Sequence, residues 1–212
     1  EGGISRTLDL LLMKDLKICG EITLPVHHCL ISKSKDLKKI TSIYAHGQSL
    51  AQCHDWIANN LPNAKKITVL SNAEGAKIAS KEKHSAAIAS ARAASIFKLN
   101  ILQNHIEDEP NNTTRFLILS DQEISPSGND KTSIVVATKN KPGAIVDLIQ
   151  PFASRKVSLT KLESRPSRIG MWEYVFFIDI EGHRDDSKIK LCLKDIEKKS
   201  SFMKFLGSYP KN

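Results

Sequence analysis

The order of segments after residue 131 restricts the fold more than any other feature of the sequence. Helical periodicity and strand-like runs alternate there, with helices at 144–154 and 187–199 and strands at 132–138, 157–163, 172–180 and 202–209. Each helix gathers its large apolar residues on one face, namely Ile145, Leu148, Ile149 and Phe152 in the first and Ile189, Leu193 and Ile196 in the second. This order predicts a ferredoxin-like βαββαβ domain over residues 132–212.

A turn-rich segment precedes this domain. Residues 121–131 (DQEISPSGNDK) cluster Ser, Pro, Gly, Asn and Asp between apolar segments, and we place a linker there. Before it, strand-like and helical segments alternate in the order 22–31, 42–46, a helix at 47–60, 67–70, 73–81, 85–89, 91–97, 101–106 and an apolar run at 116–119. The alternation predicts an α/β region whose sheet is mostly parallel and covered by helices, with a buried strand at 116–119.

The formal net charge of +8 and the isoelectric point near 9.3 fit either nucleic-acid binding or attraction of an acidic small molecule. The lysines are scattered, and the few aromatic residues are not interleaved with them as a nucleic-acid stacking surface requires. No apolar run approaches the roughly 20 residues of a membrane helix. The four cysteines lack CxxC spacing and the density of a disulfide scaffold. We therefore expect a cytoplasmic protein without nucleic-acid or membrane partners.

A first candidate site lies just before the run at 116–119. Residues 111–115 bring amides, hydroxyls and a guanidinium to the start of a strand, where loops of α/β sheets present ligand groups. Thr114 could donate a hydrogen bond to a leaving oxygen, and Arg115 could hold a carboxylate in a two-pronged contact. The same residues also fit a turn whose Asn and Thr side chains bond the local backbone.

A second candidate is the strand-to-helix junction at residues 45–53. Gln48 and Gln52 are four residues apart and share a helix face, near a helix start whose free N–H groups suit an anion. The alternative makes His46 a helix-entry residue and both glutamines solvent-facing. Adjacent His27 and His28 would point to opposite faces of a strand, so we interpret both as structural and expect no metal site.

A third candidate combines the helix start at Gly143 and Ala144 with the strand end at residues 163–166. A small-residue helix entry admits a ligand carboxylate, and Glu163 can receive an ammonium group, which together describe an amino-acid site. By spacing alone, a glycine helix entry and an unrelated proline turn explain these residues equally well. The sequence has no GxGxxG, Walker, GxSxG or HExxH motif, so it implies no cofactor.

Several segments, taken in order, resemble motifs of prephenate dehydratases that carry a C-terminal ACT domain. NNTTRFLIL resembles the family's Thr-Arg-Phe motif, and KLESRP resembles the phenylalanine-binding motif of the ACT domain. EGGISRTLDLL, YAHGQSLAQC and PGAIVDLIQPFASR are similar to the family's EGxVxxTLDLL, SHPQALAQC and PGAL segments. The ordered set covers essentially the whole chain.

The resemblance implies a lyase that converts prephenate to phenylpyruvate in phenylalanine biosynthesis, without a cofactor. It implies a two-lobed α/β dehydratase domain of the periplasmic-binding-protein type, with Thr114 and Gln52 as catalytic residues. The substrate-binding residues that it carries over are His46, Gln48, Asn112, Arg115 and Phe116. It also implies feedback by L-phenylalanine and a homodimer or dimer of dimers, with the effector bound by Gly143, Ala144, Glu163, Ser164, Arg165 and Pro166.

Two departures from the family pattern bear on these expectations. Ala45 stands where the family has the serine of Ser-His-Pro-Gln, and a Gly-rich segment with an Asn-Ser pair precedes the family's EG. We therefore expect an N-terminally incomplete dehydratase domain at 1–120, with its second lobe at about 21–110, a linker at 121–131 and an ACT domain at 132–212. The alternatives are an arogenate dehydratase and an amino-acid sensor in which only the ACT domain works. Whether a chorismate mutase domain precedes the chain stays open.

Overall fold

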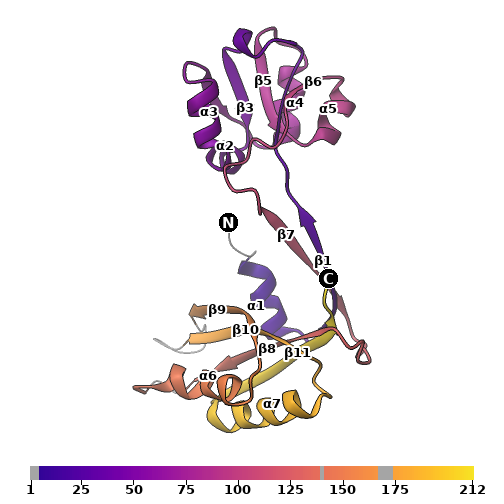
Figure 1. Ribbon diagram of the computed structural model, residues 1–212, viewed down its shortest axis with the longest axis vertical. Coiled ribbons are helices and arrows are strands. Elements are labelled where there is room, and N and C mark those ends of the chain that lie inside the picture. Colours follow the sequence, from indigo (N-terminus) through magenta and orange to yellow (C-terminus); the bar gives the residue numbers. More distant parts are fainter. Residues whose placement is uncertain (1–4, 139–140, 167–173) are drawn as a thin grey trace. The chain divides into compact units, whose positions relative to one another are not determined.

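A computed structural model of the chain describes residues 5–138, 141–166 and 174–212. The chain forms two compact units (Figure 1). One unit combines Glu1–Thr23 with Arg115–Asn212, and the other is Leu24–Thr114. Each unit has its own sheet and its own apolar core, so each can be described separately.

The unit Leu24–Thr114 is built on a five-stranded sheet. Its strand order is β4-β3-β5-β2-β6, with bounds β2 Cys29–Ser32, β3 Ser42–Ala45, β4 Lys65–Thr68, β5 Ser85–Ala89 and β6 Asn100–Gln103. Strand β3 is parallel to β4 and β5, whereas β2 is antiparallel to β5 and β6. Strand β2 therefore runs against the other four. Four of the five strands share one direction, as predicted, but the sheet is mixed, because two of its four pairings are antiparallel.

Helices cover both faces of this sheet (Figure 1). Helices α2 Gly47–Gln52 and α3 His54–Asn60 pack on one face, against Leu30 and Ile88. Helices α4 Asn72–Ala79 and α5 Ala91–Phe97 pack on the other, against Ile31 and Ala87. The second face is rich in alanine because helix and sheet approach closely there. A Cβ on Gly75 of α4 would lie 2.7 Å from the carbonyl oxygen of Tyr44, so only glycine fits.

Two predicted segments of this region are interrupted. The helix expected at 47–60 is two helices, because the Asp108 carboxylate accepts the N–H groups of Asp55 and Trp56 and so caps a new helix start after Cys53. The strand expected at 22–31 divides into β1 Lys17–Pro25 and β2. Proline cannot donate to a ladder, and β1 ends at Pro25.

The other unit contains a four-stranded antiparallel sheet in the order β11-β8-β10-β9. Its bounds are β8 Asp130–Ala137, β9 Leu159–Pro166, β10 Tyr174–Glu181 and β11 Phe202–Pro210. Helices α6 Ala144–Ser154 and α7 Ser187–Lys199 bury Leu148, Phe152, Ile189 and Ile196 on one face of it. The βαββαβ fold is confirmed. The prediction that Ile145 shares the buried apolar face of α6 was wrong, because Ile145 is 51% exposed and lies outside this core. The expected loop residues 139–140 and 167–170, and the start of the strand expected at 172, lie outside the described residues.

Helix α1 Ser5–Met13 covers the opposite face of this sheet, which no pattern in the sequence had indicated. Leu8 and Leu11 pack with Val135 and Phe177. Strand β1 crosses the same face so closely that a Cβ on Gly207 of β11 would lie 2.1 Å from the carbonyl oxygen of Ile18. The N-terminal segment and the βαββαβ domain therefore share one core.

Strand β7 Thr113–Ser120 pairs with β1 in a two-stranded sheet. The prediction that residues 116–119 form a buried strand was wrong, since Phe116 is 52% and Ile118 45% exposed. A two-stranded ribbon has no further strands to shield its faces, and among these residues Leu117 alone contributes to the core beneath it.

Two further structural facts concern the chain as a whole. In the part of the chain that the structure describes, no helix has both the length and the apolar character needed to cross a membrane. All four cysteines are free thiols.

Candidate active site

The connection between β1 and β2, residues 26–28, contacts both segments that carry the candidate catalytic residues. The Val26 N–H donates to the carbonyl oxygen of Asn112 at 2.8 Å. Two residues further on, His28 Nε2 lies 2.9 Å from Oε1 of Gln52. Two residues of chain span at most about 7 Å. The segment that carries Asn112 and the helix that carries Gln52 are therefore attached to the same short piece of backbone.

The Gln52 side chain is oriented by His28. The amide oxygen of glutamine can only accept, so Nε2 of His28 carries the proton and donates it to Gln52 Oε1. His28 is 5% exposed, and its backbone N–H is bound by Glu107. Within the described residues the Gln52 amide nitrogen has no hydrogen-bond acceptor. The arrangement therefore presents an NH₂ donor suited to a substrate oxygen.

At the start of α2, His46 caps the helix and Gln48 faces solvent. Nδ1 of His46 accepts the Gln48 N–H at 3.3 Å, which makes His46 the N-cap of α2. The His46 N–H donates to Asn72, whose amide in turn donates to the Ser49 hydroxyl. Gln48 is exposed to solvent, and α2 is only six residues long. The helix-entry role of His46 is thus present, and substrate binding by His46 and Gln48 stays a prediction.

Thr114 lies at the start of β7, exposed to solvent like its neighbour Thr113. Successive residues of a strand point to opposite faces, so the two hydroxyls face different sides of the ribbon. Asn112 is half-buried and is held by its backbone bond to Val26. An exposed hydroxyl at the end of a fixed segment can reach a bound ligand without rearrangement of a core.

Arg115 forms a network that sequence reasoning did not find. Its Nε donates to Glu21 at 2.6 Å, its Nη1 to Asp179 at 2.5 Å and its Nη2 to the Tyr209 hydroxyl at 2.6 Å. Lys131 donates to the other oxygen of Glu21 at 2.7 Å. All three guanidinium nitrogens are therefore bound to protein groups, and binding of a substrate carboxylate by Arg115 stays a prediction.

The two carboxylates of the network are buried, whereas the Arg115 side chain between them is 27% exposed. The Glu21 side chain is 1% exposed and that of Asp179 9%. Burial acts to raise the pKa of Glu21, but Lys131 and Arg115 outweigh it and hold that pKa below 4.5. Burial and the charge of Asp179 raise the pKa of Tyr209 well above 10, so its hydroxyl stays protonated. Ser133 completes the network by donating to Asp179 at 2.5 Å.

The predicted effector residues are divided between the two faces of the βαββαβ sheet. Gly143 is the N-cap of α6, with a positive φ of 77° that favours glycine. Glu163 pairs with Phe177 across β9 and β10, and Phe177 belongs to the core beneath α1. The Glu163 side chain therefore faces away from the α6 side of the sheet, where it forms an ion pair with Lys161 at 2.9 Å.

The remaining effector candidates follow the same alternation. Arg165 shares the α1 face with Glu163 and lies 3.3 Å from Asp9. Ser164 and Pro166 alternate with them and belong to the α6 face. An amino-acid pocket that uses both the start of α6 and Glu163 would therefore need residues from two different copies of the sheet.

Comparison with known proteins agrees with these features. Residues 1–124 match the profile of the family described as prephenate dehydratase, and residues 132–198 match that of the ACT domain. The chain is 49% identical over 212 residues to the bifunctional chorismate mutase/prephenate dehydratase of Stutzerimonas stutzeri, covering 100% of this chain and 58% of that protein. It is 39% identical over 215 residues to the prephenate dehydratase of Methanocaldococcus jannaschii, covering 99% of this chain and 77% of that protein.

A solved structure shows the same fold. The prephenate dehydratase from Arthrobacter aurescens in complex with L-Phe is 34% identical and superimposes with a TM-score of 0.85. The match covers 100% of this chain and 72% of that one. The α/β architecture with a C-terminal βαββαβ domain is therefore shared with this relative of known structure.

Proposed function

The chain belongs to the prephenate dehydratase family, and from this premise we propose that the protein converts prephenate to phenylpyruvate, carbon dioxide and water. The bond between the ring and the carboxylate breaks, and its electron pair enters the ring. The bond between the ring and the 4-hydroxyl breaks at the other end, and that hydroxyl leaves as water after it receives a proton. Aromatisation drives both cleavages, so the protein needs only to orient the substrate and supply the proton.

Thr114 is the proposed donor to the departing hydroxyl. Its own hydroxyl is exposed at the start of β7, just beyond the segment fixed by Asn112 and Val26. Gln52 is proposed to hold a substrate oxygen through its amide NH₂, because His28 occupies the amide oxygen. The observation that carries the proposal is the attachment of both Asn112 and Gln52 to the connection at residues 26–28.

The proposed role of Thr114 is tested by replacing each of two neighbouring threonines. Thr114→Ala should lower kcat by about 100-fold or more with little change in KM, the scale of a lost proton donor. Thr113→Ala removes a hydroxyl that is also exposed, from the same strand, and should leave kcat nearly unchanged. Phenylpyruvate formation by the natural full-length protein is the measurement. A near-normal kcat in Thr114→Ala would remove it from the mechanism.

The role of His28 is tested by a double-mutant cycle, because its effect should pass through Gln52. His28→Ala should lower kcat by about tenfold in the native background and have little further effect once Gln52→Ala is present. Additive losses would show that His28 acts by another route. The cycle separates orientation of the amide from a general loss of stability, since a stability effect would persist in both backgrounds.

We also propose that the βαββαβ domain binds L-phenylalanine as a feedback inhibitor, at a pocket shared by two copies of the chain. The relative from Arthrobacter aurescens was solved in complex with L-Phe. In one chain Glu163 and the start of α6 lie on opposite faces of the sheet, so a second copy is needed to supply both the ammonium and the carboxylate partner. A homodimer is therefore the smallest assembly proposed.

The remaining alternatives differ in substrate. An arogenate dehydratase would turn over the amino-acid analogue of prephenate with the higher kcat/KM. A sensor would bind L-phenylalanine and turn over neither compound. Parallel assays with both substrates, together with calorimetry in L-phenylalanine, separate the three outcomes.

A further inference from the structure

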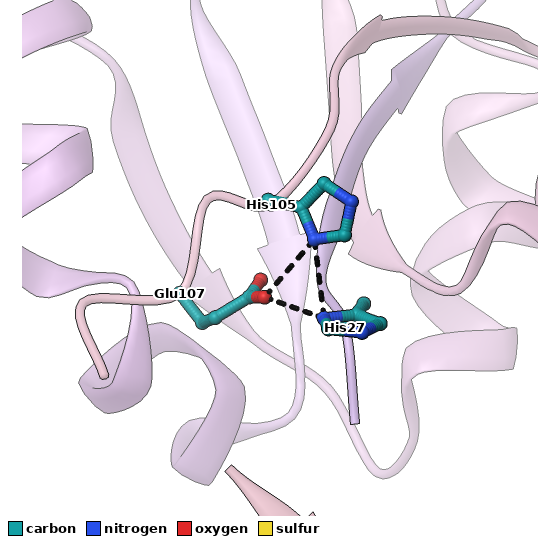
Figure 2. A group of neighbouring side chains, drawn as sticks. All are labelled: His27, His105 and Glu107. Carbon is teal, nitrogen blue, oxygen red and sulfur yellow. Dashed lines mark hydrogen bonds and ion pairs between the residues drawn. The ribbon is translucent and has the colours of Figure 1, made fainter. Parts of the chain in front are cut away.

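The connection at residues 26–28 also contributes to a second cluster. His27, His105 and Glu107 direct one ligand atom each at a common point, as Figure 2 shows. His27 Nδ1 lies 2.8 Å and His105 Nδ1 3.4 Å from the same oxygen of Glu107, Oε1. The two Nδ1 atoms are 3.1 Å apart. All three residues belong to the unit Leu24–Thr114, so the cluster is complete within one unit of one chain.

These three separations suit a metal ion better than hydrogen bonds alone. A neutral imidazole nitrogen either donates or accepts, and the Glu107 oxygen only accepts. If His27 donates to Glu107, His105 Nδ1 must share that hydrogen. If both rings carry a hydrogen on Nδ1, the two hydrogens meet between nitrogens only 3.1 Å apart. A cation would accept electron pairs from all three atoms at once.

The geometry approaches that of tetrahedral zinc. Zinc bonds of about 2.0–2.2 Å to nitrogen and oxygen place neighbouring ligand atoms about 3.3–3.6 Å apart in a tetrahedron. The observed separation of 3.4 Å fits that spacing, and the separations of 2.8 and 3.1 Å reach it by widening by about 0.5 and 0.2 Å. Two histidines and one glutamate form a three-ligand set with an open fourth position, as in His₂Glu zinc sites.

The protein itself holds the ligand atoms in place. The Glu107 side chain is 3% exposed, and its second oxygen, Oε2, accepts the backbone N–H of His28 at 2.8 Å. That bond turns Oε1 toward the two rings. The Ile106 N–H donates to the His28 carbonyl at 3.0 Å, which fixes residues 105–107 against residues 27–28. The His27 and His105 side chains remain 46% and 65% exposed, so an ion has an open path.

We propose that His27, His105 and Glu107 form a binding site for a divalent first-row transition metal, with Zn²⁺ as its probe ion. None of the three residues is assigned a role in the proposed catalysis, but the site adjoins it, because Glu107 also binds the backbone N–H of His28. Ligation would join the β1–β2 connection to the segment that follows β6, and so stabilise the folded unit. Imidazole ligands favour Zn²⁺ over Mg²⁺, which takes oxygen ligands.

The test uses the whole chain, freed of any purification tag and of metal by a chelator. Titration calorimetry with Zn²⁺ should give one site per chain, and Zn²⁺ should raise the thermal unfolding midpoint where Mg²⁺ does not. His105→Ala should weaken Zn²⁺ binding by about 100-fold or more, since loss of even an indirect partner of a metal ligand costs 10–100-fold. Glu107→Gln and His27→Ala should abolish the shift in the midpoint as well.

His84→Ala is the matched control. His84 is exposed in the same unit and has a positive φ of 66°, close to the 51° of His105, so both variants carry the same backbone change. The control should bind Zn²⁺ like the native chain. Because His105 is largely exposed, its variant should also fold, with a native circular dichroism spectrum as the check.

Three outcomes would overturn the proposal. They are the absence of saturable Zn²⁺ binding, equal binding by the native chain and His105→Ala, and loss of binding in His84→Ala but not in the three ligand variants. The visible spectrum of bound Co²⁺ gives a further check, since a tetrahedral His₂Glu site and an octahedral surface site absorb differently. An octahedral spectrum that is unchanged in Glu107→Gln would also count against it.

Discussion

The pairing of Arg115 with two buried carboxylates leads to a prediction that separates an architectural role from a substrate-binding role. Arg115→Ala removes the shared partner of Glu21 and Asp179, whose side chains are 1% and 9% exposed. Removal of one partner of a buried ion pair costs about 3–5 kcal/mol, because the other charge is left without compensation. Lys131 still reaches Glu21 and Ser133 still reaches Asp179, so we expect the lower end, about 3 kcal/mol.

The control is a second arginine ion pair in the same unit. Arg155, the C-cap of α6, donates to Asp195 of α7, and the two side chains are 30% and 36% exposed. Arg155→Ala should cost no more than about 1 kcal/mol, because exposed pairs are screened by solvent. Urea unfolding followed by circular dichroism gives both free energies. A cost for Arg115→Ala within 1 kcal/mol of the control would refute the argument from burial.

The pH dependence of stability provides an independent reading of the same network. The pKa of Glu21 is lower in the folded chain than its ordinary value of 4.5. Its contribution to stability is therefore fully present above pH 4.5 and is lost as the pH falls through the lower folded value. Arg115→Ala should weaken this acid sensitivity because Glu21 loses one of its cations. If Arg115 instead served mainly to bind substrate, its replacement would raise KM and leave both stability measurements unchanged.

Two further predictions concern the same unit. Gly207→Ala should lower the free energy of unfolding by about 3 kcal/mol or more, because the new Cβ would lie 2.1 Å from the Ile18 carbonyl oxygen at a φ of 146°. Gly128→Ala is the control, since its φ of 91° is also positive but the space around it is open, and it should cost about 1 kcal/mol. Thermal unfolding measures both. Glu163→Ala should weaken L-phenylalanine binding in calorimetry by roughly 5- to 150-fold through loss of a charge-assisted contact, while Glu197→Ala on the exposed side of α7 should not. If both glycine replacements lowered stability equally, the close approach of Gly207 to Ile18 would not be the cause. If both glutamate replacements weakened L-phenylalanine binding equally, Glu163 would not contact the ligand.

The sequence predicted the bounds of those helices and strands whose ends are set by residues within or next to the element itself. The bounds of α5, α6, α7 and β5 coincide with the predicted 91–97, 144–154, 187–199 and 85–89. Ser90 caps α5 by accepting the Ala93 N–H, and Gly143 begins α6 with a positive φ. In these segments the apolar period, the cap and the turn residue agree, so no distant contact is needed to place the boundary.

Distant contacts explain the elements that were missed. The break between α2 and α3 depends on Asp108, which follows Asp55 by 53 residues. The residues bound by Arg115 lie 64 to 94 positions away in the sequence. His28 was interpreted as structural on the assumption that it lay in a strand, but it lies in a connection and orients Gln52. A single sequence carries no local signal for such pairs, because neither partner has a periodicity or a turn that marks it.

The Thr-Arg-Phe motif shows how these two levels combine. Thr114 is the last residue of one compact unit and Arg115 the first residue of the other. Neighbouring residues of a strand point to opposite faces, so the Thr114 hydroxyl and the Arg115 guanidinium leave β7 on different sides. Arg115 connects β7 to Asp179 and Tyr209 of the βαββαβ sheet. If effector binding changed those contacts, it would act on Arg115, which is joined to Thr114 by a peptide bond. The proposed regulation would then reach the proposed proton donor through one covalent bond.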